Sequence, residues 1–268
     1  MAKNQNLIDW WSCADAWFWK GASWPQTGQD APAGYTHVVV EFNRAITESE
    51  ESLLLFSSGN NDNYDTVNKE TLIAGKRYLY NICDLDFWEG ADNISLGIRS
   101  RTGGLSNISS VVSKISLQNL GDKYFINPID VSLFKSEDSW KNWVSWAAAN
   151  VQFGNPYSDN NWFDYDYLVV ELKRETTNEG IALRVQDGDP GVMFGLRNGT
   201  KFYVETKDIA LKDGEIPYAE IEKMGLAVVV DPYAGNYGDV PANFFDDVFD
   251  YLYFTNTKPD NTYIEFDK

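Results

Sequence analysis

The sequence predicts an all-β protein made of two tandem antiparallel β-sandwich domains related by internal duplication. The segment YTHVVVEFNR, which begins at Tyr35, returns as YDYLVVELKR at Tyr165. GKRYLY at Gly75 returns as GTKFYV at Gly199, and the matches keep their order while the offset between them drifts. Such drift is expected when strands are retained and loops take insertions. Short β-rich runs at regular spacing in both copies are typical of antiparallel sandwiches.

Clusters of Gly, Asn, Asp and Ser delimit the predicted strands. In the first copy we expect strands at residues 35–46, 52–58, 77–85, 94–101 and 111–119, with a further short one at 17–19. In the second copy we expect them at residues 165–175, 181–187, 192–196, 201–209, 224–231 and 248–257. Residues 140–151 have apolar side chains at helical spacing and predict one short helix or a broken strand.

The boundary between the copies is expected near residues 120–123, which gives domains at 1–122 and 123–268. A length of 268 residues agrees with two domains, and each half is long enough to bury its own core. The seam is short and polar, too short for a free linker, so we expect the domains to lie close together.

Alignment of the two copies separates the faces of the predicted strands, because alternate residues of a strand lie on opposite faces. The positions that are apolar in both copies of the first shared strand predict its core face: Val38, Val40 and Phe42, with Leu168, Val170 and Leu172. On the next strand the predicted core positions are Leu53 and Leu55, with Leu183 and Val185. Between them Leu54 and Phe56 are replaced by Arg184 and Gln186, which predicts an outer face that differs between the copies.

Charge restricts the partners of the chain. The net charge is −18 and both halves are acidic, so the protein repels phosphates and anionic lipid, and we expect neither nucleic-acid nor membrane binding. No apolar run approaches the ~20 residues of a membrane span, and the amino-terminal MAKNQN lacks the apolar stretch of a signal peptide. We expect a monomeric segment of a longer secreted protein. Cys13 and Cys83 leave both a disulfide bridge and two separate thiols open.

Catalytic motifs are missing from the sequence. The one histidine, His37, is matched by Tyr167 in the second copy, and no nucleophile elbow or phosphate loop is present, so we interpret His37 as a packing residue of a strand. The oxygen-rich segments 60–65 and 187–189 are typical of turns, with a structural calcium as the alternative. Glu41 and Glu171 recur, each with an arginine three residues on, which favours a structural role over an acid–base pair.

Aromatic residues are the unusual part of the composition, with ten Trp and fifteen Tyr. A flat ring with a polar edge suits the face of a pyranose, while nearby polar side chains can bind its hydroxyls. We expect about half of the tryptophans to be core residues. The candidate carbohydrate-binding residues are Trp17, Trp19, Trp24, Tyr64, Trp88, Trp143, Trp146, Trp162, Arg184, Gln186, Tyr233 and Tyr237.

An acidic, tryptophan-rich tandem of β-rich units that is nearly free of His and Cys resembles the paired carbohydrate-binding modules of bacterial plant-cell-wall hydrolases. The resemblance implies jelly-roll, galactose-binding-like sandwiches and an extracellular protein that binds β-glucan, xyloglucan or a related neutral hemicellulose without turnover or cofactor. It also implies that the chain is appended to a glycoside hydrolase. Two alternatives stay open, a small β-sandwich glycanase or lyase and a protein-binding adhesion or scaffold module.

Overall fold

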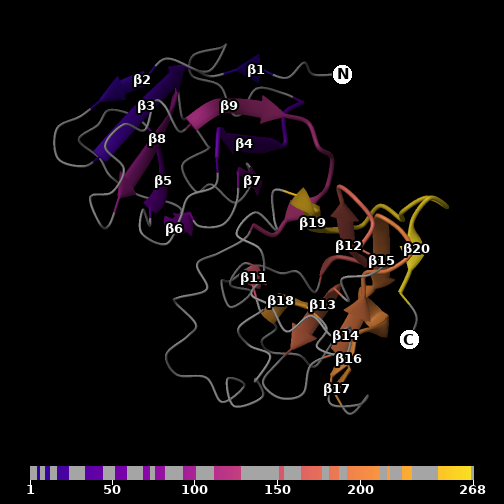
Figure 1. Cartoon of the computed structure of the whole chain (residues 1–268). Coiled ribbons are helices and arrows are strands. Elements are labelled where there is room, and N and C mark those ends of the chain that lie inside the picture. Colours follow the sequence, from indigo (N-terminus) through magenta and orange to yellow (C-terminus); the bar gives the residue numbers. More distant parts are fainter. Residues whose placement is uncertain are drawn as a thin grey trace. The chain divides into compact units, whose positions relative to one another are not determined.

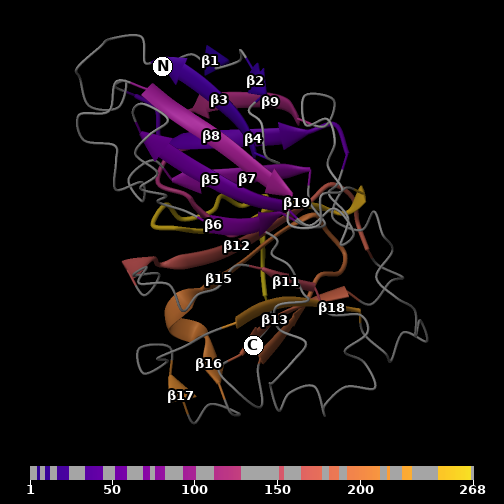
Figure 2. The same cartoon turned by 90° about the vertical axis from the view of Figure 1, so that its left-hand side faces the viewer.

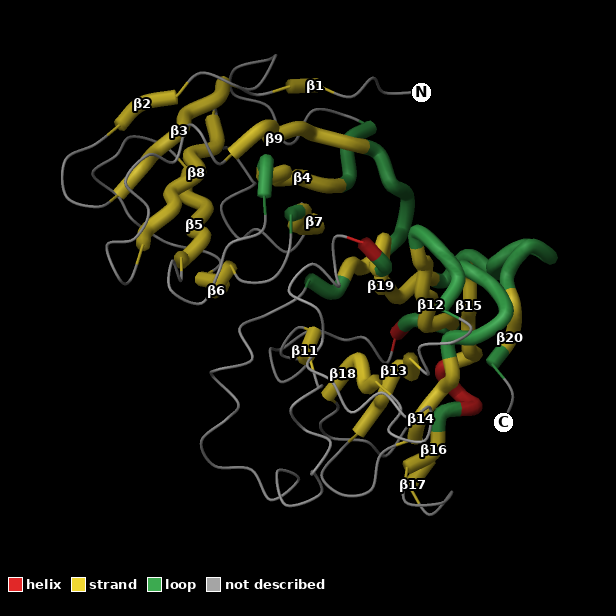
Figure 3. The backbone as a smooth tube through the Cα atoms, in the orientation of Figure 1, coloured by secondary structure: helices red, strands yellow, loops and turns green. Residues whose placement is uncertain are grey.

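The computed structural model divides the chain into two compact units, unit 1 at Met1–Asp122 and unit 2 at Lys123–Lys268. The structure describes residues 5–6, 10–12, 17–23, 34–44, 52–58, 69–72, 76–81, 93–100, 112–127, 151–153, 164–176, 181–186, 192–211, 216–217, 225–230 and 247–266. It describes the backbone alone within 5–23, 52–72, 93–100, 151–153, 210–217 and 225–230, and at residues 112, 115, 181, 184, 186 and 193. The described residues are mostly strand, so the all-β prediction is confirmed, as Figure 3 shows.

The described strands of unit 1 form two sheets (Figure 1). The sheet that carries the first repeated segment, here called the repeat sheet, has the order β1-β9-β4-β7. Its strands are β1 (Gln5–Asn6), β9 (Val112–Gln118), β4 (His37–Phe42) and β7 (Arg77–Asn81). The second sheet of unit 1 has the order β2-β3-β8-β5-β6, formed by β2 (Trp10–Ser12), β3 (Trp17–Ser23), β8 (Asn93–Ser100), β5 (Ser52–Ser58) and β6 (Lys69–Leu72).

Unit 2 also has a repeat sheet, with the order β10-β19-β12-β15-β20. Its strands are β10 (Tyr124–Phe125), β19 (Phe249–Thr255), β12 (Tyr167–Leu172), β15 (Lys201–Glu205) and β20 (Ile264–Glu265). The second sheet of unit 2 has the order β11-β18-β13-β14, formed by β11 (Val151–Phe153), β18 (Gly225–Val230), β13 (Ile181–Gln186) and β14 (Val192–Gly195). A separate hairpin pairs β16 (Ala210–Leu211) with β17 (Ile216–Pro217).

The repeated segments form the central strands of the two repeat sheets. In unit 1, β4 lies between β9 and β7, and in unit 2, β12 lies between β19 and β15. Both central strands have a register shift at the same place in the repeat, between Glu41 and Phe42 and between Glu171 and Leu172. The shared sequence therefore specifies a shared local irregularity as well as a shared strand.

The predicted core face of the central strands is confirmed. Side chains at its six positions are at most 5% exposed, at Val38, Val40, Phe42, Leu168, Val170 and Leu172. The alternate face is covered as well, because His37, Val39 and Val169 are at most 1% exposed. A strand that is buried on both faces reads as an uninterrupted apolar run, which explains the VVV and LVV of the repeat.

Most predicted strands are present, with shorter ends. The segment 52–58 is a strand over its full predicted length, whereas the strand expected at 201–209 ends at Glu205 and continues as a 3-10 turn, Thr206–Asp208. The prediction of purely antiparallel pairing is wrong at one edge, since β20 runs parallel to β15. The segment expected at 140–151 lies outside the described residues except for Val151, which begins β11.

The C-terminal segment of unit 2 packs across both of that unit's main sheets. Phe266 stacks on Phe202 of β15, with ring centroids 5.5 Å apart, and also contacts Phe194 of β14 at 4.8 Å. The backbone N–H of Phe266 donates to the carbonyl of Tyr203 at 2.9 Å. Phe266 therefore connects the repeat sheet and the second sheet through one aromatic cluster. Ile264 lies against Gly199, where any Cβ would meet its side chain.

Candidate functional site

Two of the predicted tryptophans lie on the second sheet of unit 1. Trp17 and Trp19 begin β3, and Trp19 pairs with Trp11 of β2 on one side and with Gly97 of β8 on the other. Trp17 pairs with Arg99 of β8. Directly paired residues lie on the same face of a sheet with Cβ atoms about 5 Å apart. The backbone thus brings three tryptophans, one glycine and one arginine to one face. Figure 2 shows β3, β8 and β5 of this sheet side by side.

The rows of directly paired residues continue from β8 across β5 and β6. Leu55 pairs with Gly97 and with Lys69, and Leu53 pairs with Arg99 and with Thr71. We call this face the tryptophan face. Its positions are Trp11, Trp17, Trp19, Gly21, Ser23, Leu53, Leu55, Ser57, Lys69, Thr71, Asn93, Ser95, Gly97 and Arg99.

The alternate positions of the sheet form a face of a different character. One of its rows contains Phe18, Ile98 and Leu54 and ends at Glu70 of β6, and the next contains Lys20, Leu96 and Phe56. Ile94, Ala22 and Leu72 belong to the same face. A sheet with one apolar and one polar face normally packs its apolar face on the core. The pattern therefore favours this apolar face as the core side and the tryptophan face as the outer side.

The second sheet of unit 2, where several side chains are described, provides a comparison for that assignment. Leu183 and Val185 of β13 are 0% exposed, so the prediction that they are core residues is confirmed. Leu183 pairs with Val228 and Phe194, a row that corresponds in character to Leu54 with Ile98. By the character of these rows Leu54 resembles Leu183, whereas the expected core position of Leu53 and Leu55 stays a prediction, because the side chains of β5 are not described.

Arg184 and Gln186 lie on the opposite face of β13 from these buried residues. Arg184 pairs with Ala227 of β18 and Met193 of β14, and Ala227 pairs with Gln152 of β11. This face of unit 2, called the Arg184 face, has the positions Gln152, Ala182, Arg184, Gln186, Met193, Gly195, Gly225, Ala227 and Val229. Its positions are small or polar except for Met193 and Val229, and Ala182 is buried. The tryptophan face, in contrast, has three aromatic positions.

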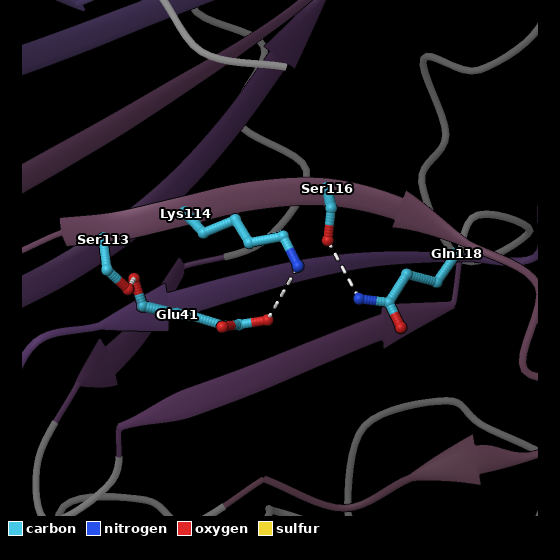
Figure 4. A network of polar contacts seen from close by, with 5 residues as sticks. All are labelled: Glu41, Ser113, Lys114, Ser116 and Gln118. Atoms are coloured by element: carbon cyan, nitrogen blue, oxygen red, sulfur yellow. Dashed lines mark hydrogen bonds and ion pairs between the residues drawn. The ribbon is translucent and has the colours of Figure 1, made fainter. Parts of the chain in front are cut away.

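A network of polar side chains lies on the alternate face of the repeat sheet in unit 1 (Figure 4). Lys114 Nζ of β9 lies 3.5 Å from Glu41 Oε1 of β4, and Gln118 Nε2 donates to Ser116 Oγ at 2.9 Å. The Ser113 hydroxyl donates to the backbone carbonyl of Glu41 at 3.0 Å. Glu41 is therefore paired with a cation, as expected for a structural carboxylate.

The equivalent carboxylate of unit 2 has different partners. Glu171 Oε1 accepts hydrogen bonds from the hydroxyls of Tyr253 at 2.8 Å and Tyr263 at 2.7 Å. Burial, together with these hydrogen bonds, raises the pKa of Tyr263 to about 12 and raises the pKa of Tyr253 above its ordinary value. Lys201 Nζ lies 5.0 Å from the centroid of the Tyr263 ring, and Lys123 Nζ lies 4.5 Å from that of Tyr253. The sequence analysis did not predict this cluster, for which the alternation TYIEF after the last predicted strand is a weak signal.

His37 is a buried packing residue, as predicted. It is 0% exposed, and its Nδ1 lies 2.6 Å from the hydroxyl of Thr36, which also accepts a hydrogen bond from the Leu120 N–H. The residues that the structure describes contain no group of three or more His, Cys, Asp or Glu that could hold a metal ion. Within the same ranges, no helix has the length and apolar character needed to cross a membrane.

The remaining predicted site residues lie outside the described residues: Trp24, Tyr64, Trp88, Trp143, Trp146, Trp162, Tyr233 and Tyr237. The segments 60–65 and 187–189, proposed as turns or calcium loops, and the two cysteines lie outside them too. Trp11, Gly97 and Arg99 were not predicted, although the adjacent Trp10 and Trp11 of a strand must lie on opposite faces. No protein-family model matches the chain, and no curated protein shows significant sequence similarity to it.

Proposed function

We propose that the chain is a non-catalytic protein that binds a plant cell-wall polysaccharide with a neutral backbone, such as β-glucan, xyloglucan or a related hemicellulose. The observation that carries the proposal is the placement of Trp11, Trp17 and Trp19 in neighbouring positions on one face of a sheet. Indole rings at neighbouring strand positions offer successive apolar surfaces on which sugar rings can stack. The opposite, apolar face of the same sheet is available for the core.

The composition of the tryptophan face supports binding of an extended polymer. Gly97 follows Trp19 in its row and, because it has no side chain, leaves room for a ligand beside the indole. Asn93, Ser95 and Ser57 follow on the same face and supply hydrogen-bond donors and acceptors for hydroxyl groups. Stacking then supplies affinity, and the polar positions supply selectivity.

We further propose that each unit is a jelly-roll-like β-sandwich and that the units arose by duplication. In support, the same central strand, with the same register shift, is flanked in the same way in both repeat sheets. The aromatic cluster of Phe194, Phe266 and Phe202 connects the two main sheets of unit 2, as a sandwich core does. Thr176 supports the same arrangement, because its hydroxyl donates to the carbonyl of Leu196, which follows β14, at 2.5 Å.

The environments of the candidate acids and of the histidine favour binding over turnover. Glu41 is paired with Lys114, Glu171 accepts two tyrosine hydroxyls, and His37 is fully buried. None of these arrangements resembles a pair of carboxyl groups that face each other across a substrate. The proposal includes an extracellular location and attachment to a glycoside hydrolase, both of which rest on the resemblance to carbohydrate-binding modules.

Affinity electrophoresis of the whole chain tests the function. The protein is run through native gels that contain mixed-linkage β-glucan, xyloglucan or xylan, and a gel with no polysaccharide is the reference. Retardation in at least one gel, without release of reducing ends from the same polysaccharide in solution, is the expected result. Steady release of reducing ends would identify a glycanase instead, and unchanged mobility in every gel would leave a protein-binding module as the better reading.

A further inference from the structure

Charge is distributed unevenly over the second sheets. The chain contains 40 acidic and 22 basic residues. The tryptophan face nevertheless contains Arg99 and Lys69 and no Asp or Glu among its positions. The Arg184 face of unit 2 likewise contains one arginine and no acid. Two faces that correspond in the two units, in a strongly acidic protein, are therefore locally basic.

The electrostatic interaction of a bound ligand with this face depends mainly on the nearest charged side chains. At physiological ionic strength the Debye length is about 8 Å, so acids beyond that distance are largely screened. Arg99 pairs directly with Trp17, and directly paired residues have Cβ atoms about 5 Å apart. A charge on a sugar stacked at Trp17 would therefore interact with Arg99 more strongly than with the net charge of the chain.

Arginine at position 99 is well suited to bind a carboxylate. A guanidinium presents several N–H donors in a fixed plane and matches a carboxylate through two parallel hydrogen bonds. It can also donate to the hydroxyls of a neutral sugar, but a carboxylate is its better acceptor. Lys69 adds a second cation on the same face, in the row of Trp19 and Gly97.

We propose that the tryptophan face binds a polysaccharide whose neutral backbone carries carboxylate substituents of the uronic-acid type, and that Arg99 is the residue that selects them. This proposal rests on the proposed function and specifies its substrate class. Backbone rings stack at the tryptophan positions, and the substituent pairs with Arg99. A polymer with an acid on every residue lies outside the proposal, because this face contains two cations, Arg99 and Lys69, and most of its carboxylates would have no partner.

A matched pair of ligands and a matched pair of variants test the proposal on the whole chain. The ligands are mixed-linkage β-glucan and xyloglucan, each compared with the same polymer after a small fraction of its primary alcohols has been oxidised to carboxylates. The variants are Arg99→Gln and, as the control, Lys20→Gln. Lys20 belongs to the same sheet but lies on the apolar face, in the row of Leu96. Affinity electrophoresis at low and high salt gives the dissociation constants.

The expected result is that the wild-type chain binds the oxidised polymer roughly two- to fivefold more tightly than its neutral parent, the range of a partly exposed ion pair. The preference should shrink at high salt, disappear in Arg99→Gln and persist in Lys20→Gln. Equal binding of both polymers by the wild-type chain, or a preference that survives Arg99→Gln, would overturn the inference while the proposed function stands. Failure of the wild-type chain to bind any of the four polymers or xylan would overturn both.

Discussion

The hydroxyl of Tyr263 donates a hydrogen bond to Glu171 Oε1 at 2.7 Å and so fastens the C-terminal segment to the central strand of the repeat sheet in unit 2. The equivalent carboxylate of unit 1, Glu41, is paired with Lys114 instead. One position that is Glu in both copies of the repeat thus serves two different local structures. In unit 2 the carboxylate holds a strand, β20, that has no counterpart in the described part of unit 1.

Removal of the Tyr263 hydroxyl should destabilise unit 2. Tyr263→Phe retains the ring and its contact with Lys201 but loses a hydrogen bond to a carboxylate, which should lower the free energy of unfolding by about 1 kcal/mol. Denaturant unfolding monitored by circular dichroism measures the change. Tyr167→Phe is the control, because the ring of Tyr167 contacts Tyr203 while its hydroxyl has no hydrogen bond within the described residues. An equal loss in both variants would show that the effect is not specific to Glu171.

Alkaline pH should weaken the same cluster. The pKa of Tyr263 is raised from 10.0 to about 12 in the folded protein, so the folded state holds this proton more tightly than the unfolded state. The resulting stabilisation is complete below the unfolded pKa and is lost as pH rises from 10.0 to about 12. The melting temperature should therefore fall over that range, and fall less steeply in Tyr263→Phe. Parallel profiles for the wild type and the variant would contradict this account.

Gly199 should stabilise unit 2 because its missing side chain leaves room for Ile264 of the C-terminal segment. Ala at this position would place its Cβ against Ile264, whose side chain is 41% exposed and can give way, so the expected cost is only about 1 kcal/mol. Gly195→Ala is the matched control, since nothing lies within 4 Å of a Cβ there. The double variant Gly199→Ala with Ile264→Ala should recover the loss relative to Ile264→Ala alone. The midpoints of denaturant unfolding measure these losses of stability. If Gly199→Ala still destabilises the protein in the Ile264→Ala background, contact with Ile264 is not the cause.

The central strands could be predicted from the sequence because the duplicated segment marks them and because burial on both faces produces an apolar run. Burial of the alternate face could not be predicted from Val39 or Val169 alone. An isolated valine is compatible with either face of a strand, and what covers it depends on the tertiary fold. The parallel edge strand β20 was missed for a similar reason, because two residues carry too little pattern to identify a strand.

The candidate site was predicted in part. Alternation in Trp17-Phe18-Trp19 was enough to place two indoles on one face, but their partners depend on pairing between segments far apart in the sequence. Arg99 and Gly97 could be assigned to the site only once β3 was paired with β8. The equivalence of Leu53 with Leu183 was expected from an offset of one repeat, and it stays a prediction because the side chains of β5 are not described. A difference of one residue in that offset exchanges the faces of a strand, which only the register reveals.

Calorimetric titration of the whole chain with oligosaccharides of the polysaccharide that retards it tests the central claim, that the tryptophan face binds sugar. The double variant Trp17→Ala with Trp19→Ala is compared with Trp10→Phe, a tryptophan of the same sheet that lies on the apolar face in the row of Lys20. The account predicts binding at least roughly tenfold weaker in the double variant, at about 1 kcal/mol for each stacked ring, and unchanged binding in Trp10→Phe. Wild-type affinity in a correctly folded double variant would contradict it.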